Sequence, residues 1–310
     1  MLNSYASRAV LIESSCGAGV RTARPDPHRL RDTHIPIMRF DMSTTLQGSK
    51  RRDVLRTMGF AALSVAALLP QRRAEAKEAH DVAMLAGLDG ATTLTQLGKR
   101  LAAAPRRRNF ESVPFMLTDR QYWDFDAAEQ LLQYQSKARQ VWENTDLAGP
   151  WPGLMREAMN GQVFANRNAD FLAVSATHGL AHLALFAQPM WDTYNLAALA
   201  GPKFATNTLI VEKAGVSRSD SIENVAGFYG PANNNVTSLQ RRGAVFIACH
   251  DSIHAISRAL QSSAGRPAAS ADRIAADLTN NLIPDVVLVP SVVSFMVDLQ
   301  SRGFTYSKGG

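Results

Sequence analysis

Short apolar runs that alternate with helical patterns after residue 169 constrain the fold of this 310-residue chain more than any other feature. Five runs have the apolar or β-branched composition of strands: residues 171–175, 207–212, 244–249, 285–289 and 304–306. Apolar residues at helical spacing lie between them, in residues 178–187, 236–242, 252–260 and 292–299. Alternating strands and helices are typical of a mainly parallel sheet covered on both faces. We therefore expect an α/β domain over residues 166–310.

The preceding segment, residues 77–165, has a helical pattern instead. Five of its apolar residues fall on one helical face: Leu131, Tyr134, Ala138, Val141 and Trp142. A second short helix is expected over residues 154–159, after a break rich in Gly and Pro. No catalytic pattern occurs here, so we expect a helical segment in front of the α/β domain.

A basic, apolar and small-residue order further upstream indicates a secretory signal over residues 42–76. The pair Arg51-Arg52 precedes an apolar run at 58–69, and Ala74 and Ala76 follow at the spacing of a cleavage site. The run of 12 residues spans roughly 18 Å, too short for a bilayer core of about 30 Å. The adjacent arginines resemble a twin-arginine export signal.

That resemblance implies that the export machinery recognises the precursor and that the mature protein is periplasmic or otherwise exported. Residues 1–41 show no helical or strand period, so we expect a non-structural extension or a true start at Met42. No later stretch is long and apolar enough to span a membrane.

Charge and cysteine content argue against a nucleic-acid partner and against an internal disulfide. Residues 1–76 carry 12 Lys and Arg against 6 Asp and Glu, whereas residues 77–310 carry 21 of each. The basic pI of the whole chain therefore belongs to the leader, and we expect no nucleic-acid partner. Beyond the leader, Cys249 is the single cysteine, so an internal disulfide is excluded.

Two of the expected strands are each followed by a pair of histidines four residues apart: His178 with His182, and His250 with His254. Cys249 ends the second of these strands. If the strand order resembles 2-1-3-4-5, the two strands are neighbours at the topological switch point, where ligands bind in open parallel sheets. Every histidine beyond the leader except His80 then lies at one edge of the sheet.

This grouping supports two kinds of chemistry. Histidines four residues apart on a helix can share a metal ion such as Zn or Cu, which makes four residues tentative ligands: His178, His182, His250 and His254. A cysteine before a helix N-terminus and near imidazoles has a lowered thiol pKa, which favours an accessible, partly ionised Cys249. The alternative for each histidine is a local hydrogen bond or a surface position.

Residues 242–250, Arg-Gly-Ala-Val-Phe-Ile-Ala-Cys-His, resemble the Gly-Val-x-Phe-x-x-Cys strand of the DsrE/DsrF-like sulfur-relay family. Residues 283–291 and 299–306 are similar to that family's C-terminal signature, and the resemblance covers roughly residues 165–310. It implies a flavodoxin-like fold, homo-oligomers and, in several members, a cysteine that carries persulfide sulfur. On that pattern Cys249 is the candidate sulfur carrier. His178 and His250, which the strand pattern places at the same edge, are the other candidate catalytic residues.

Three hypotheses follow for the function. The leading one is an exported DsrE-like protein that binds or transfers sulfur through Cys249. The second is a His-rich metal-binding protein, and the third is a non-enzymatic ligand-binding or interaction module that uses the same crevice. The sequence has no Gly-x-Ser-x-Gly, Cys-x-x-Cys or phosphate-loop motif, so it gives no support to a serine hydrolase, a dithiol oxidoreductase or a nucleotide enzyme.

Overall fold

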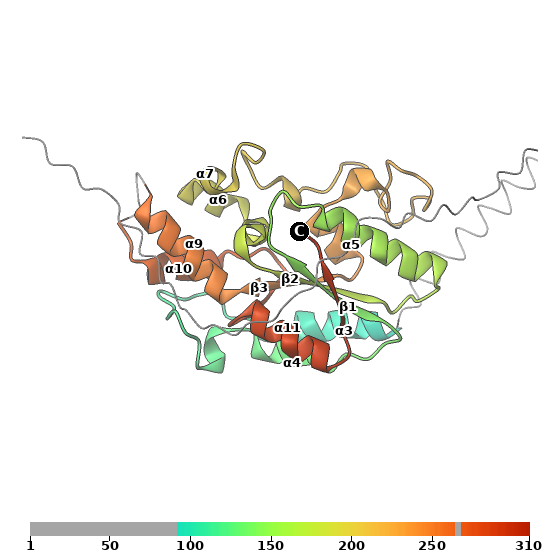
Figure 1. Ribbon diagram of the computed structural model, residues 1–310, viewed down its shortest axis with the longest axis horizontal. Helices are drawn as coiled ribbons and strands as arrows, with labels where there is room; N and C mark the ends of the chain where they lie inside the picture. The colour runs from blue at the N-terminus through green and yellow to red at the C-terminus, as the bar shows by residue number, and fades with distance from the viewer. Residues whose placement is uncertain (1–91, 264–267) are drawn as a thin grey trace, which may run out of the picture. The chain divides into compact units, whose positions relative to one another are not determined.

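A computed structural model of the chain describes residues 92–263 and 268–310 (Figure 1). The expected extension at 1–41 and the expected signal at 42–76, with Arg51, Arg52, Ala74 and Ala76, lie outside the described residues. So does His80. No helix within the described part of the chain is long and apolar enough to cross a membrane.

A five-stranded, all-parallel sheet forms the centre of the described structure, which confirms the expected α/β class. Its strands are β1 (Arg139–Asn144), β2 (Leu172–Thr177), β3 (Val245–Cys249), β4 (Val287–Val289) and β5 (Thr305–Lys308). They are arranged in the order β4-β3-β2-β1-β5. The inner strands β2 and β3 are buried along their whole length, as expected for strands covered on both faces.

Most of the helices cover one face of the sheet: α5 (Trp151–Asn160), α6 (Gln188–Tyr194), α7 (Ala197–Ala200), α8 (Val236–Arg241), α9 (His250–Ser262) and α10 (Ala271–Asn280). Figure 1 shows α5, α6 and α7 above the sheet and α9 and α10 beside β3. Shorter helical turns lie between these helices and the strands: η2 (Gly161–Ala165), η3 (Gly179–Leu185), η4 (Thr208–Ile210) and η5 (Pro231–Asn233). A further turn, η1 (Arg120–Tyr122), comes before β1. Trp151 and Phe246 meet edge to face in the core of this layer.

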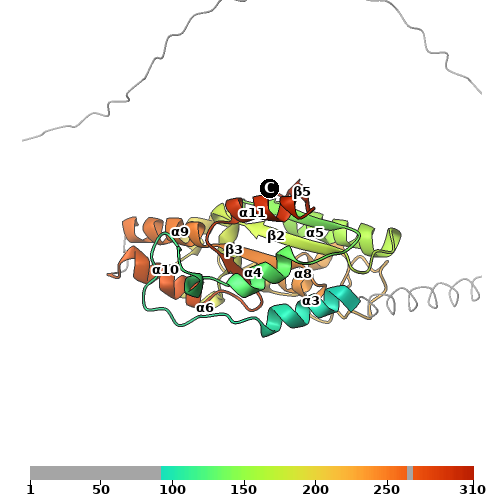
Figure 2. The same cartoon turned by 90° about the horizontal axis from the view of Figure 1, so that it is seen from below.

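The other face is covered by α3 (Thr92–Ala103), α4 (Phe125–Leu132) and α11 (Val292–Ser301), which Figures 1 and 2 show on the same side of the sheet. The handedness of the connections explains why α11 lies on the face opposite to the helices between β1 and β4. From β1 to β4 the chain moves across the sheet in one direction, and it then returns through α11 to place β5 beside β1. Right-handed crossovers in opposite directions must pass over opposite faces.

The first correction concerns residues 131–142, where we expected one continuous helix face. Helix α4 ends at Leu132, and residues 139–144 form β1. The strand pairs with β2 on one side and β5 on the other, so ladder hydrogen bonds outweigh the local helical spacing. β1 therefore belongs to the same sheet as the four strands that follow it.

The second correction concerns residues 207–212, which were expected to form a strand. They contain the short turn η4, and Val211 is exposed. The amide of Asn207 donates to the carbonyl groups of Ala184 and Phe186, at 3.0 and 2.9 Å, and so holds the segment against η3 instead of in the sheet. With one strand lost and β1 gained, the observed strand order differs from the assumed order 2-1-3-4-5.

Candidate functional site

The carboxyl ends of β2 and β3 meet at one edge of the sheet, as predicted. The two strands are parallel neighbours, with Thr177 opposite Ala248. The next residue of each chain segment is a predicted site residue, His178 after β2 and Cys249 at the end of β3. The structure therefore brings both segments to the same edge, although their side chains do not share one environment.

Cys249 is buried, with 3% of its surface exposed, which differs from the accessible thiol that we expected. Side chains alternate along a strand, and the alternation of β3 directs Cys249 into the cluster under α11, together with Val289 and Val292. The backbone N–H of Val292 donates to the Cys249 sulfur at 3.4 Å. The thiol thus lies at the N-terminus of α11 and precedes α9 directly.

His250 and His254 lie on the same face of α9, and their rings are 4.7 Å apart between centroids. Both are 1% exposed. The Nε2–H of His250 donates to the carbonyl oxygen of Pro114 at 2.8 Å, and the loop that carries Pro114 continues to Phe115, whose ring meets His254 edge-on. The predicted helical spacing of this pair is confirmed, and a loop from residues 113–115 shields it from solvent.

Burial determines the protonation of these two rings. Desolvation is the largest cause that lowers the pKa of His250, to about 4, and the Pro114 carbonyl opposes it. Desolvation also lowers the pKa of His254, while Asp272, 3.9 Å from its Nδ1, acts in the opposite direction. Both imidazoles are therefore neutral at neutral pH. The Nδ1 of His250 and the Nε2 of His254 have no hydrogen-bond partner in the described structure.

His182 lies in η3, which packs against α9, and its side chain is fully buried beside Phe186. Neither of its ring nitrogens has a hydrogen-bond partner among the described residues. Desolvation is again the largest cause that lowers its pKa, to about 3, and the charges of His178 and His250 act in the same direction. Because η3 is a 3₁₀ turn that begins after His178, the predicted α-helical pairing of His178 with His182 is not formed.

His178 instead joins a partly exposed cluster that the sequence did not reveal. Its Nε2 lies 3.1 Å from a carboxylate oxygen of Glu143, and the Tyr306 hydroxyl donates to the other oxygen of Glu143. The bond from Tyr306 is the main cause that lowers the pKa of Glu143, and the same bond raises the pKa of Tyr306. Glu143 was missed because its strand was interpreted as part of a helix.

A buried polar row also lies at this edge, between β1 and β2. The Asn144 amide donates to Ser175 at 2.7 Å, and the hydroxyl groups of Ser175 and Thr177 are 2.7 Å apart. Asn144 Oδ1 has no partner in the part of the chain that the structure describes. Polar residues inside a buried strand, as at 175 and 177, were the available sequence signal for this row.

The predicted residues are thus divided among three environments at one edge. Cys249 lies under α11, three imidazoles are buried around η3 and α9, and His178 lies with Glu143. No group of three or more His, Cys, Asp or Glu side chains within residues 92–263 and 268–310 is arranged closely enough to hold a metal ion. The carboxyl edge does contain three neutral imidazoles, His182, His250 and His254, with ring nitrogens that have no hydrogen-bond partner among the described residues.

Comparison of the chain with models of protein families, with curated proteins and with solved structures gave no match. The fold and the site therefore define the class of this protein: an α/β protein with an all-parallel sheet and a buried histidine cluster at the carboxyl edge.

Proposed function

We propose that this protein binds a transition metal ion, Zn or Cu, through the imidazoles at the carboxyl edge, with His250 and His254 as the first ligands. One observation carries this proposal: buried ring nitrogens of His182, His250 and His254 have no hydrogen-bond partner among the described residues. An unsatisfied buried polar atom costs about 1–3 kcal/mol. An ion that accepts the lone pairs of His250 and His254 would remove that cost at their unpartnered nitrogens.

The protonation and orientation of His250 support the proposal. Its Nε2–H donates to Pro114, so the lone pair is on the unpartnered Nδ1. Histidines that ligate metals usually donate the other ring N–H to a carbonyl or carboxylate in this way. Its lowered pKa keeps the lone pair free at neutral pH, where a protonated ring could not bind a cation.

The remaining groups of the site have supporting roles. Asp272 lies near the Nδ1 of His254, on the side away from the free Nε2, where it can orient the ring. His182 lies in η3, which packs against α9, but it would have to move to join His250 and His254, since no three such side chains of the described residues lie close enough to hold an ion. A bound ion would supply a fixed positive charge that can hold a small anionic or soft ligand.

A binding titration with matched variants tests this function. Tag-free protein should bind Zn or Cu, and His250→Gln combined with His254→Gln should weaken the affinity by roughly 100-fold or more. Loss of a group that only hydrogen-bonds to a ligand already costs about 10–100-fold, and loss of the ligand itself should cost more. His178→Gln is the matched control, because its Nε2 already lies against Glu143. Equal affinity of the double variant and the wild type would contradict the proposal.

The sulfur function at Cys249 is a second proposal, supported by the hydrogen bond from Val292. The same N–H, at the N-terminus of α11, would donate to a persulfide anion carried by Cys249. Because Cys249 is 3% exposed, this function requires the start of α11 to move away.

Mass spectrometry of the intact protein after exposure to polysulfide decides this second function. The sulfur proposal predicts the addition of one sulfur atom to the wild type and none to Cys249→Ser. The structure predicts that iodoacetamide modifies Cys249 slowly until denaturant is added. If neither reagent reaches the native thiol, Cys249 is a core residue and the sulfur function is withdrawn.

Export through the twin-arginine route, periplasmic location, a DsrE-like flavodoxin-type fold and homo-oligomers remain proposals that rest on the sequence resemblances. The all-parallel sheet and the position of Cys249 at the end of a strand are compatible with a DsrE-like fold. The strand order β4-β3-β2-β1-β5 is the feature that any related structure would have to share.

A further inference from the structure

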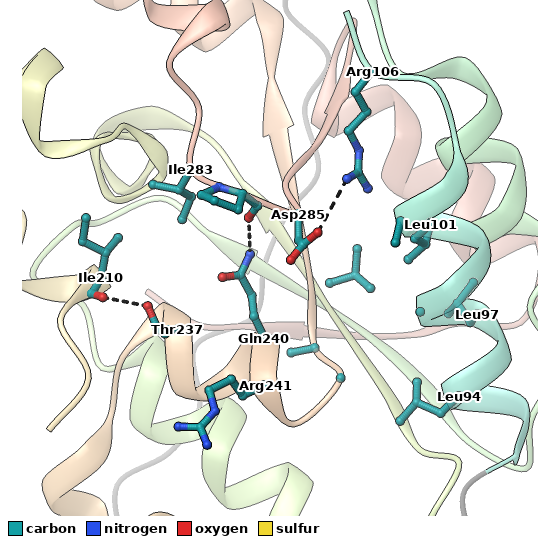
Figure 3. A pocket seen from close by; sticks show the side chains of 16 residues that line it. Leu94, Leu97, Leu101, Arg106, Ile210, Thr237, Gln240, Arg241, Ile283 and Asp285 are labelled. Atoms are coloured by element: carbon teal, nitrogen blue, oxygen red, sulfur yellow. Dashed lines mark hydrogen bonds and ion pairs between the residues drawn. The ribbon is translucent and has the colours of Figure 1, made fainter. Parts of the chain in front are cut away.

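A cavity of about 580 Å³ lies at the amino edge of the sheet, opposite to the histidines. Its lining includes Val245 at the start of β3 and Asp285 just before β4, and the other walls come from α3 and α8 (Figure 3). This volume falls within the range of about 300–1,000 Å³ that is usual for small-molecule sites. Nothing in the proposed metal or sulfur functions uses this cavity.

The long wall of the cavity is apolar. Leu94, Leu97 and Leu101 are spaced along α3 so that they follow one another on the helix face, and Figure 3 shows them side by side along the cavity. Ile210 and Ile283 contribute further apolar surface. A ligand that fills this space therefore needs an apolar body.

The polar end of the cavity is formed by Arg106, whose guanidinium is poorly satisfied. Its two ion contacts are long, 3.7 Å to Asp285 and 4.0 Å to Asp124, and its Nε has no hydrogen-bond partner in the described structure although it is buried. Asp124 is already held by Arg108, at 2.9 and 2.6 Å, and by the backbone N–H of Leu288. It is therefore not available to Arg106 as a close partner.

The other cation of the lining has a close partner. Arg241 forms a short ion pair with Glu212, and the neighbouring amide of Gln240 donates to the carbonyl of Pro284 at 2.8 Å. The remaining carboxylate, Asp285, is mostly exposed, so it can turn toward solvent when a ligand arrives. Among the described lining residues, Arg106 is the cation without a close ionic partner.

We propose that this cavity binds a small amphiphilic carboxylate, with the carboxylate on Arg106 and the apolar tail along the leucines of α3. A guanidinium forms paired hydrogen bonds with a carboxylate, and such bonds are stronger in a poorly hydrated site. The same site would disfavour a cationic amphiphile because Arg106 would repel it. This proposal is independent of the metal site at the other edge.

Calorimetric titration of the full-length protein with decanoate tests the proposal, with decanol and decylamine as probes of the same tail length. We expect decanoate to bind more tightly than decanol, and decylamine not to bind. Arg106→Gln should weaken decanoate binding by roughly 10- to 100-fold, the effect of losing hydrogen bonds to a charged group, and should leave decanol nearly unchanged. Lys99→Gln is the matched control, because it removes one positive charge from an exposed position of α3 that does not line the cavity.

A second variant tests the location without removing a core side chain. Gly98 lines the cavity, and a Cβ atom placed there would meet no other heavy atom within 4 Å. Gly98→Leu should therefore fold, occupy the open space and abolish binding of decanoate and decanol alike. Unchanged decanoate affinity in either Arg106→Gln or Gly98→Leu, or no decanoate binding by the wild type, would overturn the proposal.

Discussion

Glu143 shows how one side chain at the carboxyl edge depends on its two partners. Its carboxylate accepts the Tyr306 hydroxyl and lies 3.1 Å from His178, and the first of these contacts is the main cause of its lowered pKa. A carboxyl group with a lowered folded-state pKa stabilises the protein above its unfolded-state pKa, here near 4.5. That stability is lost as the pH falls through the folded-state value.

We therefore predict that Tyr306→Phe lowers the free energy of unfolding at pH 7 by up to about 1 kcal/mol, since the pair is partly exposed. The difference from the wild type should shrink as the pH falls below about 4.5, where the carboxylate is protonated in the unfolded chain. Denaturant unfolding at several pH values measures this. A difference that stays constant down to the lowest pH would show that Tyr306 acts through packing and not through Glu143.

The sequence predicted the edge of the sheet at which the site residues lie, but not the face to which each side chain points. His178, Cys249, His250 and His254 were placed at one edge from the strand pattern alone, because parallel neighbours share their carboxyl edge. The division of these residues between two faces was not foreseen. It depends on the strand's exact end and on the 3₁₀ geometry of η3, which the spacing of residues does not reveal.

Among the helices and strands, two segments were predicted wrongly: β1 was expected to be helical, and residues 207–212 were expected to form a strand. In β1, Val141 and Trp142 are typical strand residues, but their distance from Leu131 and Tyr134 also matched a helix. Only the pairing with β2 and β5 distinguishes the two. By contrast α8, α9 and α11 were predicted close to their observed bounds. The periodicity of all three agrees with their packing, and α8 and α11 also have capping side chains, Asn235 and Ser291.

Gly309, directly after β5, leaves no room for a side chain. The N–H of Gly309 donates to the backbone carbonyl of Glu143. A Cβ atom on Gly309 would lie 2.1 Å from Asn144 Oδ1 and 2.7 Å from Trp151 Cβ. We expect Gly309→Ala to destabilise the protein by about 1–3 kcal/mol, as other overpacking substitutions do.

Gly161→Ala is the matched control. Gly161 has helical backbone angles and open space around its Cβ position, so alanine there should stabilise the protein by about 0.5–1 kcal/mol. Thermal unfolding of both variants measures the contrast. Equal stability of Gly309→Ala and the wild type would show that the residues after β5 do not pack against β1 as described.

At the scale of the whole molecule, the α/β class followed from the alternation of apolar runs with helical patterns, and the structure confirms it. The order of the strands could not be predicted from the sequence, because it depends on which strands pair with one another in the sheet. The cavity at the amino edge was also not visible in the sequence. It is formed by side chains from α3, α8, the start of β3 and the residues just before β4, which are distant along the chain.

Export is the whole-molecule property that the sequence predicts most directly. Arg51→Lys combined with Arg52→Lys should leave the precursor in the cytoplasm and unprocessed, because the export machinery reads the arginine pair itself. Fractionation of cells, followed by N-terminal sequencing of the wild-type product, checks both the route and a mature N-terminus near Lys77. Normal export of the double variant would contradict this prediction.

We propose that buried imidazoles at the carboxyl edge ligate a metal ion, and X-ray absorption spectroscopy of the zinc-loaded protein tests this most directly. We expect at least two imidazole nitrogens at about 2.0–2.1 Å from the metal, the usual Zn–His distance. We also expect this signal to be lost in His250→Gln with His254→Gln and retained in His178→Gln. A spectrum with oxygen ligands alone, or one unchanged in the double variant, would contradict the proposal.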